Sequence, residues 1–128
     1  MRNIFLMLII SFLTNHCLAQ NNCSNFKVGK FIYTYSAKNT ISVTRKRNKQ
    51  IEFDIKNKIT TKLKIKWISD CEYQLTQTWS SSKAKRKQGP SPRTIVIIHI
   101  YESNRYEYTC KCTYGDPNAF LGTMIKVN

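Results

Sequence analysis

The residues of this chain best suited to hold a metal are its cysteines and one histidine. Cys110 and Cys112 stand two apart, so a strand would present both sulfurs on one face. Three further candidates could complete a thiolate site: Cys23, Cys71 and His99. The chain also begins with an apolar leader typical of export, and four cysteines in a small exported domain favour disulfides. We therefore predict two disulfides and no metal site.

The pairing of those disulfides is not fixed by the sequence. Cys110 and Cys112 are poorly placed to bond each other, because two residues on one face of a strand hold their sulfurs in unsuitable geometry. We expect each of them to reach Cys23 or Cys71, in an order that the sequence leaves open.

Acid–base groups are present but lie in positions that favour structural roles. His99 falls within an apolar strand, which favours a hydrogen-bonded core histidine. Asp70 suits a turn, and Glu72 and Glu107 alternate outward on their strands. The sequence contains no nucleophile elbow, phosphate-binding loop, zinc-protease motif or paired carboxylates. We expect a protein that is not an enzyme and that uses no cofactor.

Aromatic residues recur on the inward face of several expected strands. They could line an apolar cavity in which tyrosine hydroxyls orient a small apolar ligand. The alternative is an ordinary packed core, since side chains can fill a barrel of eight strands. The predicted ligand-binding residues are Phe31, Tyr33, Trp67, Tyr73, Tyr106 and Tyr108.

Basic residues dominate the charge of the chain. It carries 21 Lys and Arg against 7 Asp and Glu, a net charge of +14. Such a balance predicts attraction to anionic envelope polymers, lipid head groups or acidic glycans, although a merely solvated surface is the alternative. The aromatics alternate inward, so stacking platforms for a specific nucleic acid are not expected. The predicted anion-binding patch comprises Arg45, Lys62, Lys64 and Lys66, extended by Lys46, Arg47 and the basic cluster at 83–87.

The first 19 residues resemble a signal peptide. Arg2 is followed by the apolar run Ile4–Leu13, which is too short to span a bilayer. Cys17 and Ala19 are small residues at the −3 and −1 positions of a cleavage site, so cleavage is expected after Ala19. It would leave one exported domain over residues 20–128. A lipoprotein cleaved before Cys17 is less favoured, because His16 replaces the small residue that such a site needs. No other apolar run is long enough to be a transmembrane segment.

The rest of the chain reads as short strands separated by turns. Its centre is Ile59–Thr78, where Leu63, Ile65 and Trp67 alternate with lysines before a tight turn. The segment Ser80–Pro92 is expected to be an exposed, mobile loop, and no helix is predicted. In the strand at 50–56 the apolar residues Ile51, Phe53 and Ile55 are expected to face inward. The other strands are expected at 26–35, 40–45, 94–101, 106–114 and 120–127, with two within 59–79.

Eight strands at nearly regular spacing predict an all-β fold. Short turns between consecutive strands favour an antiparallel eight-stranded meander, and closing it gives a small up-and-down barrel without free edges. Such a barrel would house the aromatic face inside and the lysines outside.

Several segments resemble small exported proteins of Bacteroidetes bacteria. The matching motifs are C-x-x-F-x-x-G-x-F-x-Y at 23–33 and W-x-x-D-C-x-Y-x-L-T at 67–76, with Thr44-Arg45 and a Q-I-E segment at 50–52 between them. The resemblance implies a compartment and a lineage, and no catalytic residues. Gly29-x-Phe31 also resembles the G-x-W opening of lipocalin-like barrels, which implies a barrel with a ligand cavity.

These observations together predict an exported, non-catalytic binding protein for a small apolar ligand or an anionic envelope component. The alternative is a structural or interaction protein of the cell envelope, with a filled core and a basic surface.

Overall fold

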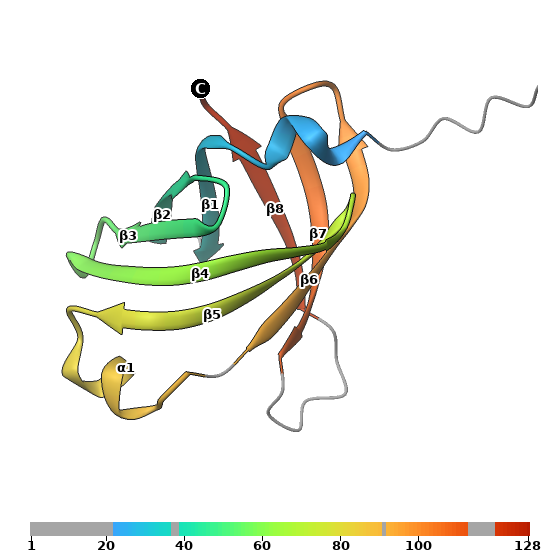
Figure 1. Cartoon of the computed structure of the whole chain (residues 1–128). Helices are drawn as coiled ribbons and strands as arrows, with labels where there is room; N and C mark the ends of the chain where they lie inside the picture. The colour runs from blue at the N-terminus through green and yellow to red at the C-terminus, as the bar shows by residue number, and fades with distance from the viewer. Residues whose placement is uncertain (1–21, 37–38, 91, 113–119) are drawn as a thin grey trace, which may run out of the picture.

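The computed structural model describes residues 22–36, 39–90, 92–112 and 120–128. Each strand pairs antiparallel with the next, and β1 pairs with β8, so the sheet closes into a barrel in the order β1 to β8 (Figure 1). The predicted all-β, eight-stranded, lipocalin-like meander is confirmed. The strands are β1 (Gly29–Ser36), β2 (Asn39–Arg45), β3 (Lys49–Asp54), β4 (Ile59–Ser69), β5 (Glu72–Ser80), β6 (Arg93–Tyr101), β7 (Arg105–Cys112) and β8 (Phe120–Lys126).

Two short helices correct the prediction that the chain has none. The 3₁₀ helix η1 (Cys23–Phe26) begins at Asn22, whose side-chain oxygen accepts a hydrogen bond from the Ser24 backbone N–H. The helix α1 (Lys83–Lys87) lies within the segment expected to be an irregular loop. Ser82 caps it by accepting the Lys85 N–H, and a run of good helix formers follows the cap. Neither helix is long and apolar enough to cross a membrane.

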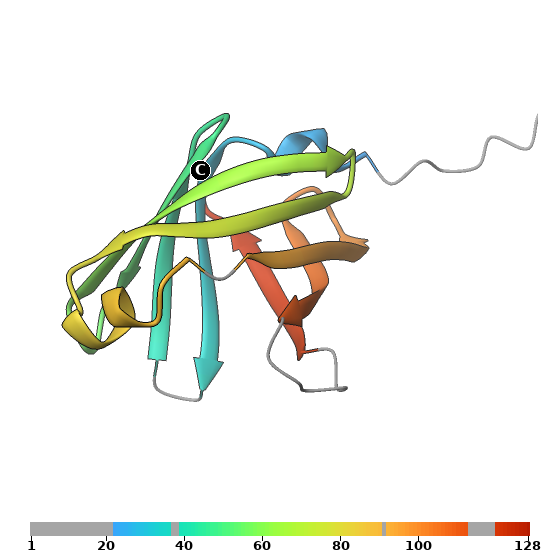
Figure 2. The ribbon, with the colours of Figure 1, turned by 60° about the horizontal axis from the view of Figure 1, so that its bottom comes forward.

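The barrel has a closed end and an open end. At the closed end η1 is tied to the turn between β6 and β7 and to the end of β8: Asn25 donates a hydrogen bond to the Ser103 carbonyl at 2.6 Å, and Lys126 donates one to the Asn25 carbonyl at 2.7 Å. At the opposite end α1 follows β5 and packs against it (Figures 1 and 2). The interior therefore opens mainly on the α1 side.

A disulfide joins Cys23 in η1 to Cys71 in the turn between β4 and β5. The expectation that Cys110 and Cys112 would each pair with one of these two is therefore wrong. Cys110 is itself disulfide-bonded, and the side chain of Cys112 lies outside the described residues. The physical reason is η1, which folds Cys23 over the closed end and holds it 5.3 Å, Cα to Cα, from Cys71.

Strand β3 faces the opposite way from the prediction. Gln50 and Asp54 are buried, whereas Phe53 and Ile55 are exposed. Pairing across the hairpin explains the difference, because Arg45 of β2 is opposite Gln50 of β3 and cross-strand partners share a face. Arg45 points inward with Val43, so β3 must turn Gln50, Glu52 and Asp54 inward as well.

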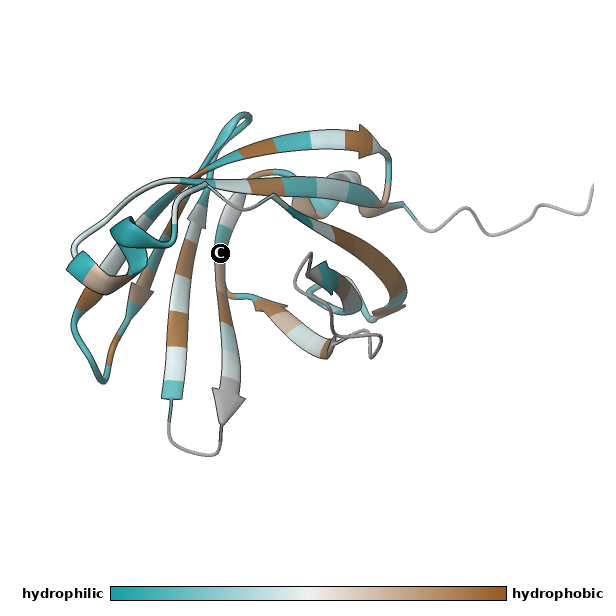
Figure 3. Ribbon diagram, turned by 90° about the horizontal axis from the view of Figure 1, so that it is seen from below, coloured by the Kyte–Doolittle hydropathy of each residue, from teal (hydrophilic) through white to brown (hydrophobic). Residues whose placement is uncertain are grey.

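Strands β2, β4 and β7 show the expected alternation of buried and more exposed residues, and hydropathy changes from residue to residue along the strands (Figure 3). The buried set includes Leu63 and Ile65 of β4, and Tyr73 and Leu75 of β5, while Lys62 on the same strand pair stays exposed. Packing is close where β7 meets β8: a Cβ at Gly122 would overlap the ring of Tyr108. These side chains fill the wall and the closed half of the barrel.

Candidate functional site

A buried arginine organises the closed half of the interior. Arg45 is only 1% exposed, and its guanidinium donates four hydrogen bonds. Two run at 2.8 Å, to the Gln50 side-chain oxygen and to the Phe26 carbonyl, and two run at 3.2 Å, to the hydroxyls of Tyr73 and Tyr106. We call this group the Arg45 cluster; its members are Arg45, Phe26, Phe31, Gln50, Tyr73 and Tyr106.

Aromatic rings surround the Arg45 guanidinium. Its central carbon lies 4.6 Å from the ring centre of Phe31 and 4.7 Å from that of Tyr73, within the range of cation–π attraction. The hydroxyls of Tyr73 and Tyr106 lie 2.9 Å apart and also bond each other. Burial raises the pKa of Tyr106 well above its ordinary value, so this phenol stays protonated. The cluster therefore fills this half of the barrel.

A chain of side-chain hydrogen bonds leads from the Arg45 cluster toward the open end. Gln50 accepts from Arg45 and donates through its amide nitrogen to Glu52 at 2.9 Å. The other carboxylate oxygen of Glu52 accepts from the Tyr33 hydroxyl at 3.5 Å. Burial, and then the charge of Glu52, raise the pKa of Tyr33, which keeps its hydroxyl a donor. Glu52 is thus held in place from two sides.

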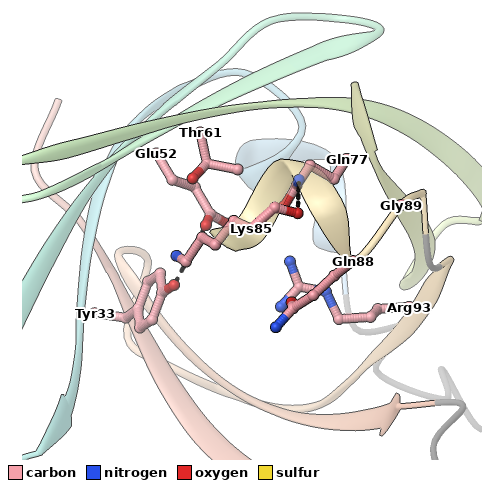
Figure 4. Close-up of a pocket in the computed structure, with 8 residues that line it drawn as sticks. All are labelled: Tyr33, Glu52, Thr61, Gln77, Lys85, Gln88, Gly89 and Arg93. Atoms are coloured by element: carbon pink, nitrogen blue, oxygen red, sulfur yellow. Dashed lines mark hydrogen bonds between the residues drawn. The ribbon is translucent and has the colours of Figure 1, made fainter. Parts of the chain in front are cut away.

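Glu52 and Tyr33 form part of the wall of a pocket under α1, which we call the open-end pocket (Figure 4). Its volume is about 570 Å³. Two cationic side chains face it, Lys85 from α1 and Arg93 from the start of β6, and the Lys85 carbonyl accepts a hydrogen bond from Gln77 at 3.0 Å. The lining residues are Tyr33, Glu52, Thr61, Gln77, Lys85, Gln88, Gly89 and Arg93.

The structure separates the six predicted ligand-binding aromatics. Of these only Tyr33 lines the open-end pocket. Phe31, Tyr73 and Tyr106 are nearly fully buried around Arg45, so a ligand could reach them only by displacing the core. Tyr108 is buried against Gly122, and Trp67 packs beside Tyr73 with ring centres 4.7 Å apart.

The predicted anion-binding patch is also divided. Arg45 does not belong to any surface, because its charge is used inside the barrel. Lys62, Lys64 and Lys66 do lie together, exposed on the outer face of β4. Lys49 of β3 is the cross-strand partner of Lys64, so a fourth cation joins this face.

Of the residues considered for acid–base chemistry, only His99 and Glu107 lie opposite each other, as cross-strand partners on the outer face of β6 and β7. His99 was expected in the core but is exposed, because the pairing register of β6 with β7 shifts between Ile97 and His99. Asp70 is exposed and lies 3.7 Å from the Lys27 ammonium. Glu107 accepts a hydrogen bond from the Tyr101 hydroxyl. Across the described ranges, no three His, Cys, Asp or Glu side chains are grouped to hold a metal ion.

Most of the pocket residues carry no signal in the sequence. Gln77, Gln88 and Arg93 carry no motif, and Lys85 was assigned to an exposed loop. The inward orientation of Glu52 was predictable from the hairpin of β2 and β3. Val43 and Arg45 face inward, and Glu52 and Gln50 are their cross-strand partners, so Glu52 faces inward as well.

Fold and site together define a small closed β-barrel with a filled, arginine-centred half and a polar pocket at its open end. No protein-family model, no curated protein and no solved structure matches this chain. The resemblance to exported Bacteroidetes proteins therefore stays a prediction.

Proposed function

We propose that the protein is a non-catalytic binding protein that holds a small polar anion in the open-end pocket. The observation that carries the proposal is the pocket lining, in which charged, amide and hydroxyl groups take the place of apolar side chains. A volume of about 570 Å³ lies within the range typical of small-molecule sites.

The charges in the pocket favour an anion. Lys85 and Arg93 face a single carboxylate, Glu52, whose oxygens already accept hydrogen bonds from Gln50 and Tyr33. Among the described residues the Arg93 guanidinium donates no hydrogen bond, so its planar pair of N–H groups is available for a carboxylate or phosphate. The amides of Gln77 and Gln88 would serve hydroxyl groups of the same ligand.

This proposal replaces the small apolar ligand expected from the sequence. Three of the aromatic side chains predicted to line an apolar cavity, Phe31, Tyr73 and Tyr106, pack around Arg45 instead. Burying an apolar ligand against Glu52, Lys85 and Arg93 would remove water from these charges without replacing its hydrogen bonds. A ligand that brings its own charge and hydroxyl groups avoids that penalty.

We also propose that the protein works outside the cytoplasm, in the periplasm or beyond. The Cys23–Cys71 disulfide supports an oxidising environment. The leader with its expected cleavage after Ala19 supports export as a signal peptide. Edman sequencing of the protein secreted by its native cells should begin at Gln20, or be blocked there if this residue has cyclised.

Calorimetric titration with three probes tests the ligand class. Glucuronate carries a carboxylate and hydroxyl groups, glucose lacks the charge, and laurate has the charge on an apolar tail. We expect glucuronate to bind most tightly and Arg93→Gln to weaken it by about tenfold or more, the loss of one charged hydrogen-bonding partner. Arg47→Gln, an exposed arginine at the closed end, is the control and should leave binding unchanged.

Two results would contradict the proposal. Tighter binding of laurate than of glucuronate would indicate that the pocket binds an apolar ligand. Failure of all three probes, with the protein folded, would favour a structural or interaction protein of the envelope, a role for which the filled closed half around Arg45 is sufficient.

A further inference from the structure

A bulge in β5 turns a tryptophan to the outside of the barrel. The alternation Tyr73, Leu75, Gln77 would place Trp79 inside, but the register with β4 shifts between Lys62 and Leu63. Lys62 is paired with Trp79 and Leu63 with Gln77, so Thr78 is the extra residue of the bulge. Trp79 consequently stands 43% exposed, with the Lys62 ammonium 5.4 Å from its ring centre.

Other exposed apolar side chains lie at the same end of the barrel. Phe53 is 38% exposed on the outer face of β3, and Ile55 is 52% exposed in the turn that follows. Phe53 is the cross-strand partner of Thr60, whose backbone bonds Ser81 just before α1. The strand pairing therefore places these residues on one rim, between the β3–β4 turn and α1 (Figures 1 and 2).

Cations surround these apolar side chains. Arg86 shares a shallow hollow of about 260 Å³ with Trp79, and Lys62 lies against the same ring. The basic rim comprises Phe53, Ile55 and Trp79 with Lys56, Lys58, Lys62, Lys83, Arg86 and Lys87, and all of these cations are exposed.

Carboxylates are kept away from the basic rim within the described part of the chain. Glu52 faces the open-end pocket, and Asp54 is 6% exposed and accepts hydrogen bonds from Asn57. Asp70 and Glu102 lie in turns at the closed end. The rim is therefore a cationic surface with apolar side chains between the charges.

We propose that the basic rim docks the barrel onto an anionic phospholipid surface. Lysines and arginines near such a surface are attracted by its negative potential, and aromatic and aliphatic side chains gain by entering the headgroup region. A soluble polyanion would be recognised by the charges alone and would leave Phe53, Ile55 and Trp79 in water. The exposed apolar side chains thus favour a lipid surface, and this inference does not depend on what the open-end pocket binds.

Vesicle co-sedimentation tests the rim, with vesicles of equal parts phosphatidylglycerol and phosphatidylcholine against vesicles of phosphatidylcholine alone. We expect binding to the anionic vesicles only, with a blue shift of tryptophan emission that Trp79→Phe removes. Arg93→Gln, inside the pocket, should leave vesicle binding unchanged, which separates failure of this inference from failure of the pocket.

Matched variants show whether the rim itself is responsible. Lys56→Gln with Lys62→Gln should weaken binding about thirtyfold, whereas Lys46→Gln with Lys66→Gln removes the same charge elsewhere and should have a much smaller effect. Ile55→Ser should weaken binding about fivefold or more. The control Ile68→Ser replaces an isoleucine that is 53% exposed at the closed end and should change little.

Three outcomes would overturn the inference. One is no binding of the wild-type protein to anionic vesicles. Another is an equal loss in the rim and control variants, which would mean that overall charge alone drives binding. The last is a rim that binds heparin or transfer RNA but no vesicles, which would make it a site for a soluble polyanion. Circular dichroism of each variant shows that the barrel is intact.

Discussion

Replacing Arg45 by methionine tests whether the buried cation holds the closed half together. Methionine keeps much of the volume of the side chain but removes every donor. The hydroxyls of Tyr73 and Tyr106 can still bond each other across 2.9 Å. The Phe26 carbonyl and the Gln50 side-chain oxygen, however, lose the partner that bonds each of them at 2.8 Å.

The magnitude follows from those two abandoned acceptors. A buried acceptor without a partner costs about 1 to 3 kcal/mol, so two of them predict a loss of about 2 to 6 kcal/mol. Loss of the ring contacts with Phe31 and Tyr73 increases the loss of stability. The variant no longer has to bury a charged guanidinium, and the desolvation cost that it avoids offsets part of the loss. We expect a net loss of about 4 kcal/mol, a large share of the ~5–15 kcal/mol of a typical domain.

Urea unfolding followed by circular dichroism measures this loss. Arg47→Met, an exposed arginine two residues away, should stay within about 0.5 kcal/mol of the wild type. Arg45→Lys should recover only part of the stability, because one ammonium cannot reproduce the geometry of four hydrogen bonds from a guanidinium. If Arg45→Met is as stable as the wild type, the cluster does not stabilise the closed half and the reasoning fails.

Three further predictions concern stability. Replacing Cys23 and Cys71 together by alanine should lower the free energy of unfolding by up to about 4 kcal/mol in urea titration, since the bridge spans a sequence separation of 48. Gly122→Ala should lower the melting temperature by several degrees in calorimetry, because its Cβ overlaps the Tyr108 ring; an unchanged melting temperature would refute this contact. Burial raises the pKa of Tyr106 and Tyr108 above 10.0, so the unfolded chain loses these protons first. The contribution of these two phenols to stability should therefore be constant below about pH 10 and fall above it, by up to about 1.4 kcal/mol per pH unit for each phenol. Their share of the 295 nm absorbance should rise only as the barrel unfolds.

The architecture was predictable because it depends on patterns that any strand must satisfy. Leu63, Ile65 and Trp67 alternate with lysines, and this period of two fixes which face of β4 is buried. Turn residues at regular spacing then fix the number of strands, and closure removes the free edges.

The interior chemistry was not predictable from alternation alone. The apolar residues in and after β3 led to a wrong prediction of its inward face. Phe53 and Ile55 lie on the outer surface, whereas Gln50 and Glu52 belong to an internal chain of hydrogen bonds. A pattern of alternation predicts that apolar residues face the core. It does not indicate that a buried arginine will require polar neighbours on the same face. The bulge at Thr78 has no marker in the sequence either, so the outward turn of Trp79 appears only in the strand pairing.

Native mass spectrometry of the protein purified without denaturation from the cells that produce it tests whether the open-end pocket holds a small polar anion. We expect a retained small molecule with an acidic group, lost from Arg93→Gln and kept by Arg47→Gln. A bare protein mass in all three samples, or a retained long-chain lipid that survives the Arg93 substitution, would contradict a polar anion site in the open-end pocket.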